Sequence, residues 1–149
     1  MIRTLEISEL DKLSDGVKQF FLESDMFRGN FNIEYFKMFW TAIYKSNVGI
    51  IFVLVDGKDE ILGAIGGVIS PDCITGILVS SEMFWYVVRE YRGRGGLSLI
   101  NRYEQWASEM GCKKMRMVHL SDLMPKKLKL FYEKRGYSEI ETVYEKECP

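Results

Sequence analysis

The residues with the clearest capacity for chemistry are the arginines and glycines at positions 92–96, Arg-Gly-Arg-Gly-Gly. They stand between an apolar run at 83–88 and an amphipathic stretch that begins at Leu97. Glycines allow a backbone to approach a ligand closely and to point its N–H groups inward, and the positive end of a following helix favours phosphate oxygens. The segment therefore predicts either an anion site suited to a pyrophosphate or a plain glycine turn into a helix.

Two common phosphate loops fit this segment poorly. A dinucleotide fingerprint needs a third glycine three residues beyond Gly95, where Ser98 stands, and it normally lies in the first strand–helix unit of a chain. A P-loop needs a Gly-Lys-Ser/Thr ending, which the sequence does not contain.

The loop instead resembles the coenzyme A pyrophosphate loop of the GNAT N-acetyltransferase superfamily, Arg-x-x-Gly-x-Gly/Ala between a strand and a helix. Val87 stands five residues before Arg92, as in that family, and residues 130–137, Leu-Phe-Tyr-Glu-Lys-Arg-Gly-Tyr, resemble its second signature, Phe-Tyr-x-x-x-Gly-Phe/Tyr. Residues 82–87 and 141–146 also resemble the small acetyltransferases carried by bacteriophages. The likeness is specific from Met83 to Tyr137 and covers the earlier residues by pattern only.

Two positions depart from the family pattern. The last Gly/Ala of the loop is Leu97, so the close packing of helix on strand expected there needs an altered loop or a shifted helix. The Asn that often stands seven residues before the signature tyrosine is Pro125, which fits the first turn of a helix.

The resemblance implies an acetyl-CoA-dependent N-acetyltransferase that transfers an acetyl group to a primary amine by direct attack in a ternary complex. It implies that Tyr132 protonates the departing thiolate of the coenzyme, although a core tyrosine is the alternative. It also implies that backbone N–H groups near Trp85 and Val87 polarise the thioester carbonyl. The full set expected to bind coenzyme A is Trp85, Val87, Arg92, Gly93, Arg94, Gly95, Gly96 and Leu97.

Acetyl transfer to an amine also needs a group that removes a proton. An amine of pKa ~10.4 costs about 4.6 kcal/mol to deprotonate at pH 7. Glu82 is the candidate base, because it interrupts an apolar strand that should be covered on both faces, where burial raises the pKa of a carboxyl. The alternative is a structural carboxylate at a strand start or in an ion pair. Glu82 lies five residues before Val87, an odd spacing that requires a bulge if both are to share a face.

Three further features of the sequence indicate roles less directly. His119, the single histidine, could orient water or acceptor, although a lone histidine is more often structural. The basic helix near the C-terminus is usually a solvated face. Aromatic residues occupy the region where the family places its acceptor wall, and most of them are expected in the core: Phe27, Phe31, Tyr35, Phe39 and Trp40.

The chain reads as one α/β domain over residues 1–149, with a mixed central sheet and helices on both faces. Periodicity predicts strands at 2–7, 50–55, 61–69, 77–88, 114–120 and 139–146 and helices at about 8–24, 32–45, 97–110 and 125–135. A hairpin turn is expected at Asp56-Gly57, and a capping box at Ser8 and Asp11. The order β-α-α-β-β-β-α-β-α-β is the GNAT order, and α+β is the label that some schemes would give it.

Composition limits the partners. A chain of 149 residues that is 47% hydrophobic can bury one sizeable core, and a net charge of −1 offers no global attraction to nucleic acid or anionic membranes. Three cysteines without close spacing argue against a disulfide framework or a zinc site, and they favour a cytoplasmic location. The sequence shows no export segment and no apolar run of the ~20 residues that a membrane span needs.

The acceptor is not determined by the sequence. A protein lysine or N-terminus, a small polyamine or antibiotic amine, and an amine on a modified nucleotide all remain open, as does the oligomeric state, including a homodimer. The contrasting hypothesis is a non-catalytic GNAT scaffold that binds coenzyme A or a partner protein, which Leu97 and Pro125 favour mildly.

Overall fold

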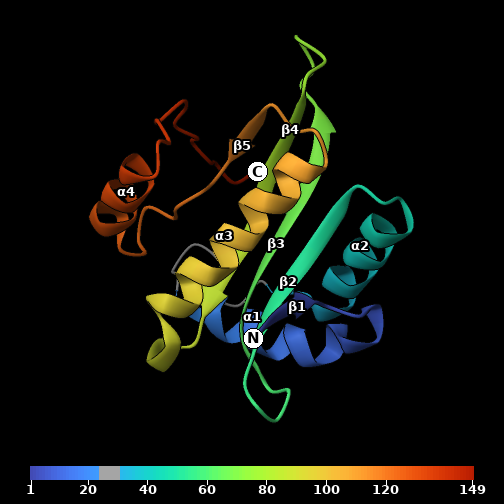
Figure 1. Cartoon of the computed structure of the whole chain (residues 1–149). Helices are drawn as coiled ribbons and strands as arrows, with labels where there is room; N and C mark the ends of the chain where they lie inside the picture. The colour runs from blue at the N-terminus through green and yellow to red at the C-terminus, as the bar shows by residue number, and fades with distance from the viewer. Residues whose placement is uncertain (24–30) are drawn as a thin grey trace. The chain divides into compact units, whose positions relative to one another are not determined.

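The computed structural model describes residues 1–23 and 31–149 (Figure 1). These residues form two compact units, Met1–Val118 and His119–Pro149. Within the described residues, no helix is both long and apolar enough to cross a membrane.

The elements follow one another in the predicted order as far as the last helix. They are β1 (Ile2–Thr4), a 3-10 turn (Ile7–Glu9), α1 (Leu10–Leu22), α2 (Ile33–Lys45), β2 (Gly49–Val55), β3 (Ile61–Pro71), β4 (Leu78–Val87), a second 3-10 turn (Arg89–Tyr91), α3 (Arg94–Glu109), β5 (Lys114–Arg116) and α4 (Pro125–Lys134). The strands lie side by side in the order β1-β2-β3-β4-β5. All neighbours are antiparallel except β4 and β5, so the predicted mixed sheet is confirmed.

Alternating side chains in the central strands build a core on each face of the sheet. In β2, Ile51, Val53 and Val55 belong to the cluster that contains residues of α1 and α2. Phe52 points the other way, into the cluster that contains Leu99, Tyr103 and Trp106 of α3. Figure 1 shows α3 in front of β3 and β4. Helices therefore cover both faces, as the period-two and helical patterns predicted.

The helix boundaries follow from local signals. The side chain of Asn32 accepts a hydrogen bond of 2.9 Å from the Tyr35 N–H and caps α2. Gly111 and Gly136, at φ of 78° and 88°, end α3 and α4, and Pro125 occupies the first turn of α4. The predicted capping box at Ser8 and Asp11 was wrong. The box forms earlier, between Glu6 and Glu9, because a 3-10 turn precedes α1.

A β-bulge interrupts β4. Gly66 of β3 pairs with Phe84 and Gly67 with Glu82, so Met83 is one extra residue with no partner across the ladder. Both glycines leave room for large rings. A Cβ on Gly66 would lie 2.5 Å from the Phe84 ring and 2.9 Å from Trp40, while a Cβ on Gly67 would overlap the Tyr103 ring. Phe84 and Gly66 thus face α2, and Glu82 and Gly67 face α3.

The prediction of the last two strands was wrong: the first of them is shorter than expected, and the second does not form. β5 covers only 114–116 of the expected 114–120, and residues 137–149 have no regular secondary structure, so the strand expected at 139–146 does not form. Ile140, Val143 and Tyr144 of that segment are exposed. A strand needs backbone partners on a neighbouring chain segment, and an alternating pattern alone does not supply them.

The glycine opposite the bulge gives a test of this packing. We expect Gly67→Ala to lower the free energy of unfolding by about 1–3 kcal/mol, because the added methyl overlaps the buried Tyr103 ring. Urea denaturation of the purified protein measures the change. Gly57→Ala is the matched control, since a Cβ there meets nothing within 4 Å, and it should change stability by less than about 0.5 kcal/mol. Equal stabilities for the two variants would contradict the close approach of α3 to β3.

Candidate active site

The glycine loop forms the start of α3. Gly93 adopts a φ of 96°, and the first hydrogen bond of the helix runs from the Leu97 N–H to the Gly93 carbonyl at 2.9 Å. The N–H groups of Arg94, Gly95 and Gly96 therefore lie in the first turn, where a helix offers no acceptor of its own and carries partial positive charge. The glycine loop thus leads into a helix as the sequence predicted, with its free N–H groups in the first turn, and the pyrophosphate site itself stays a prediction.

Glycine is also needed at the loop because α3 lies close to the sheet there. A Cβ on Gly95 would lie 2.6 Å from the Leu54 side chain, and one on Gly96 would lie 3.3 Å from the Trp85 ring. Leu97 points outward and is 42% exposed. The altered loop or shifted helix expected from Leu97 is therefore not required, because Gly96 makes the close contact.

Arg92 has a structural side chain. Its Nε donates to the Val87 carbonyl at 2.9 Å, and its Nη2 pairs with both carboxylate oxygens of Glu23 at 3.1 and 3.0 Å. The guanidinium thus joins the end of β4 to the residue that follows α1. It does not extend along the first turn of α3, so a coenzyme contact from Arg92 would have to use its backbone.

Glu82 is buried in the larger unit, with 8% of its surface exposed. One carboxylate oxygen accepts a hydrogen bond of 3.1 Å from the Val118 N–H. Burial raises the pKa of Glu82 from 4.5 to about 7, and the single N–H opposes that shift only in part. Among the described residues it forms no salt bridge, so the ion-pair alternative is not what the structure contains.

The bulge sets the direction of this carboxylate. Met83 adds one residue between Glu82 and Phe84, so Glu82 takes the same face as Val87, despite the odd spacing. Its neighbours on that face are Ser80 and Tyr103, both fully buried. The bulge that the sequence required is present.

The edge of β4 beside Glu82 is not paired with a neighbouring strand. Pairing of β4 with β5 stops at Ser81 and Arg116, after which the Val118 N–H turns to the Glu82 carboxylate. The Val88 N–H points toward β3, where it donates a hydrogen bond of 2.8 Å to the Leu62 carbonyl. The direction of backbone N–H and C=O groups alternates from one residue to the next along a strand. The backbone groups of Val87 and Trp85 therefore point away from β3, toward the edge of β4 that β5 does not reach.

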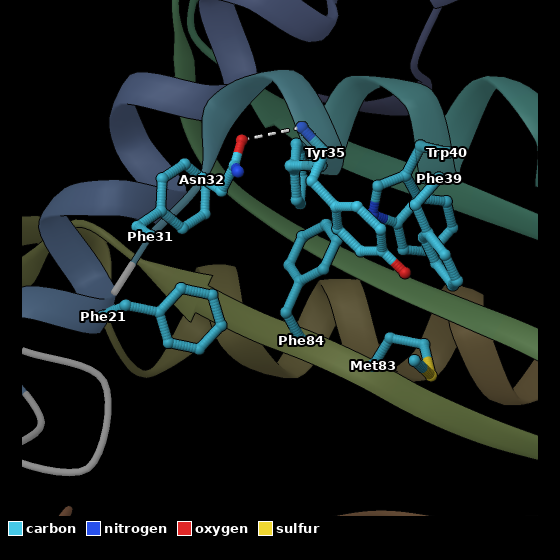
Figure 2. Close-up of a pocket in the computed structure, with 9 residues that line it drawn as sticks. Phe21, Phe31, Asn32, Tyr35, Phe39, Trp40, Met83 and Phe84 are labelled. Atoms are coloured by element: carbon cyan, nitrogen blue, oxygen red, sulfur yellow. Dashed lines mark hydrogen bonds between the residues drawn. The ribbon is translucent and has the colours of Figure 1, made fainter. Parts of the chain in front are cut away.

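An aromatic pocket lies on the other face of β4 (Figure 2). It has a volume of about 430 Å³ and is lined by Phe21, Phe31, Asn32, Tyr35, Phe36, Phe39, Trp40, Met83 and Phe84. Figure 2 shows side chains of Tyr35, Phe39 and Trp40 extending from α2 toward Met83 and Phe84 of β4. Neighbouring rings are in contact, with centroids 5.5 Å apart for Trp40 and Phe84. We refer to these nine residues as the aromatic pocket.

Five aromatic residues were placed by the resemblance in the region of the acceptor wall, most of them with a core role. Four of the five line this pocket, and Phe27 lies outside the described residues. Met83 and Phe84 were not predicted as pocket residues. A pair of glycines within a strand, such as Gly66-Gly67, is a signal of a bulge that could have identified them. The Val118 contact to Glu82 has no signal in the sequence, because it joins a side chain to a backbone group 36 positions away.

Tyr132 and His119 belong to the smaller unit. Tyr132 is the buried residue of α4, and its ring lies 5.6 Å from that of Tyr137 and 5.8 Å from that of Phe131. Its carbonyl accepts the Tyr137 N–H at 3.0 Å, which closes the end of α4. His119 begins this unit, directly after Val118. The catalytic roles of both residues stay predictions.

Solved structures share this fold over the whole chain. A glucosamine-6-phosphate N-acetyltransferase from Arabidopsis thaliana is 21% identical with a TM-score of 0.75, covering 100% of this chain and 98% of its own. A candidate acetyl transferase from Pyrococcus furiosus is 26% identical with a TM-score of 0.70, covering 99% of each chain. A ribosomal-protein-alanine N-acetyltransferase from Brucella melitensis is 13% identical with a TM-score of 0.73, also covering 99% of each. No functionally curated protein matches the sequence.

A family model gives the more direct assignment. The model described as acetyltransferase (GNAT) family matches residues 18–137, which include the aromatic pocket, the glycine loop, Glu82 and Tyr132. This stretch covers most of the 149 residues and parts of both compact units. The chain belongs to the GNAT acetyltransferase family.

Proposed function

We propose that the protein is an acetyl-CoA-dependent N-acetyltransferase that acts on a primary amine in a ternary complex, with residues 1–149 working as one domain. The observation that carries this proposal is the environment of Glu82. Its carboxyl is buried, has a pKa of about 7, and lies where the pairing of β4 with β5 ends. A carboxyl with these properties is suited to accept a proton near neutral pH, which amine acylation requires.

The start of α3 is the proposed site for the pyrophosphate of the coenzyme, and members of the family generally use acetyl-CoA. The N–H groups of Arg94, Gly95 and Gly96 would donate to phosphate oxygens, and the exposed Arg94 side chain adds positive charge. When bound, acetyl-CoA supplies the acetyl group, whose carbon bonds to the amine nitrogen as the carbon–sulfur bond breaks.

The protein would move two protons in this reaction. Glu82 and the aromatic pocket lie on opposite faces of β4, so the Glu82 carboxylate would not contact an amine on the pocket side directly. Glu82 would therefore accept the proton of the ammonium through a water molecule. Tyr132 would donate its hydroxyl proton to the thiolate, for which the ordinary pKa values of phenol and thiol, about 10 and 8.5, are close enough. The second proton that the nitrogen loses after attack would restore the phenol. The Trp85 and Val87 N–H groups at the edge of β4 would orient the carbonyl. His119 is the alternative group for orienting water.

The non-catalytic scaffold is less well supported than the enzyme. The two departures that favoured it, Leu97 and Pro125, leave the local structure undisturbed, because Gly96 makes the close helix contact and Pro125 begins α4. Calorimetry with coenzyme A, followed by a thiol-release assay with a panel of amines, tests the function. Coenzyme binding without release of thiol for any amine class would favour the scaffold. The cytoplasmic location, the bacteriophage likeness and a homodimer stay predictions.

A charge substitution tests the pyrophosphate site. We expect Gly95→Asp to bind acetyl-CoA at least about tenfold more weakly than Gly95→Asn, because a carboxylate would repel the phosphates in the first turn. The two variants have the same shape, and both must displace the flexible end of Leu54, so their difference isolates charge. Calorimetry gives both affinities, and circular dichroism checks the fold. Equal affinities would remove the loop from the proposed site.

The second test concerns the proposed acid. Tyr132→Phe keeps the ring and its contacts with Phe131 and Tyr137 but deletes the hydroxyl. Turnover should fall roughly 10²-fold or more, the scale of general acid catalysis, while acetyl-CoA affinity changes little. Steady-state kinetics on an identified acceptor measure both quantities. Tyr137→Phe is the matched control and should retain turnover within about threefold. A wild-type rate for Tyr132→Phe would exclude proton donation from this residue.

The third test concerns the base. In the wild type, kcat/KM should rise with pH through about 7, the pKa of Glu82, because only the carboxylate accepts a proton. Glu82→Gln should flatten this acidic limb and lower the plateau, since an amide has the same size but cannot be protonated in this range. If the variant kept both the limb and the rate, the carboxyl would be structural.

Stability provides an independent check of the same pKa. A folded-state pKa raised from 4.5 to about 7 means that the folded protein binds more protons in this range, so wild-type stability should fall as pH rises from about 4.5 through 7. Glu82→Gln removes the buried charge. We therefore expect similar stabilities at pH 4.5, and above pH 8 a variant that is more stable than wild type by about 3 kcal/mol in urea denaturation.

A further inference from the structure

The lining of the aromatic pocket is apolar and rich in aromatic rings. Seven of its nine residues are aromatic, the others are Asn32 and Met83, and none carries a charge. Its volume of about 430 Å³ lies within the range of small-molecule sites. The Asn32 side-chain oxygen is occupied by the cap of α2, so the polar side-chain groups of the lining are the Asn32 amide N–H, the Tyr35 hydroxyl and the Trp40 indole N–H.

The charged residues of α2 point elsewhere. Glu34, Lys37 and Lys45 lie with Met38 on a separate surface of the helix, and Lys37 is paired there with Asp11 at 2.8 Å and Glu34 at 3.8 Å. A second ammonium group on a bound amine would therefore enter the aromatic pocket without a carboxylate among its described residues. The lining offers such a charge aromatic faces but no carboxylate, so an amine with one ammonium group and an apolar ring matches these residues better than a polyamine or an aminoglycoside does.

The pocket also adjoins the edge where acetyl transfer is proposed. Met83, the bulged residue, lines the pocket and directly follows Glu82, while Phe84 lines it and directly precedes Trp85. A ring held against Phe84 would bring an amine on a short linker to the edge of β4. The ring would stay among aromatic side chains, and the apolar surroundings would favour the neutral amine that attacks.

We propose that the acceptor is a small monoamine bearing an aromatic ring, such as an arylalkylamine, with its ring in the aromatic pocket. This inference rests on the proposed N-acetyltransferase function. The products would be the N-acetyl amide of that amine and free coenzyme A: the nitrogen–carbon bond forms and the carbon–sulfur bond breaks. One ammonium proton leaves to Glu82, and the second proton lost by the nitrogen balances the one that the thiolate gains through Tyr132.

The experiment compares amines and one pocket variant. Phenethylamine, 2-cyclohexylethylamine, spermidine and a peptide with a free N-terminus are assayed for thiol release from acetyl-CoA, and phenethylamine binding is measured by calorimetry with coenzyme A present. Tyr35 is suited to mutation because it lines the pocket yet is 59% exposed, so its loss should not unfold the protein. Tyr35→Leu removes the ring, Tyr35→Phe removes only the hydroxyl, and Met38→Ala, on the separate surface of α2, is the control.

We expect kcat/KM for phenethylamine to exceed that for spermidine and the peptide by about 100-fold or more, and that for 2-cyclohexylethylamine by a smaller factor. Tyr35→Leu should raise KM and weaken phenethylamine binding about tenfold, and Tyr35→Phe, which keeps the ring, should lose less than Tyr35→Leu. Met38→Ala should stay within about threefold of wild type.

Each contrary result has a distinct meaning. Efficient acetylation of spermidine or the peptide, with neither binding nor reaction of phenethylamine, would overturn the inference and leave the proposed function standing. Phenethylamine turnover that Tyr35→Leu does not affect would overturn the placement of the ring in this pocket. Failure of acetyl-CoA to bind at all would overturn the proposed function, and the assignment of an acceptor with it.

Discussion

One extra residue in β4 determines where the chemical groups of this protein point. Reversing the parity of a strand moves every side chain to the opposite face. Met83 produces that reversal in the middle of β4, so Phe84 joins the core of α1 and α2 while Glu82 lies under α3. The aromatic pocket, the buried carboxyl and the approach of both helix layers all depend on this bulge, and the glycines opposite it make room for the rings that it redirects.

The buried carboxyl in turn depends on the end of β5. A strand that continued past Arg116 would use its N–H groups in the ladder with β4. Here the ladder stops, and the Val118 N–H donates to Glu82. One hydrogen bond does not offset the cost of burying a negative charge, so the carboxyl keeps its proton up to about pH 7. The same unfavourable burial that reduces stability above this pH prepares the group to exchange a proton near neutrality.

Patterns within short segments predicted the fold well, and contacts between distant segments explain what they missed. Alternation in β2 and the apolar stripe of α3 required only neighbouring residues, so both elements were predicted correctly. The strand expected at 139–146 was wrong because its pattern says nothing about a pairing partner. For the candidate site, the sequence predicted that Glu82 is buried and that it needs a bulge to share a face with Val87, and both features are present. It could not identify Val118 as the donor or Phe84 as a pocket wall, because these contacts depend on how β4, β5 and α2 meet.

The positions of the two proposed binding regions favour direct transfer over a route through a protein nucleophile. The glycine loop contacts Leu54 and Trp85 on the α3 face of the sheet, and the aromatic pocket lies on the face of α1 and α2. Two substrates bound to opposite faces do not compete for space, and the edge of β4 past Ser81 adjoins both regions. A covalent relay would need a nucleophile at that edge. Cys112 lies beyond the end of α3, where burial raises the pKa of its thiol and disfavours the reactive thiolate. Simultaneous binding on the two sides of β4 would therefore supply the physical basis for the proposed ternary complex.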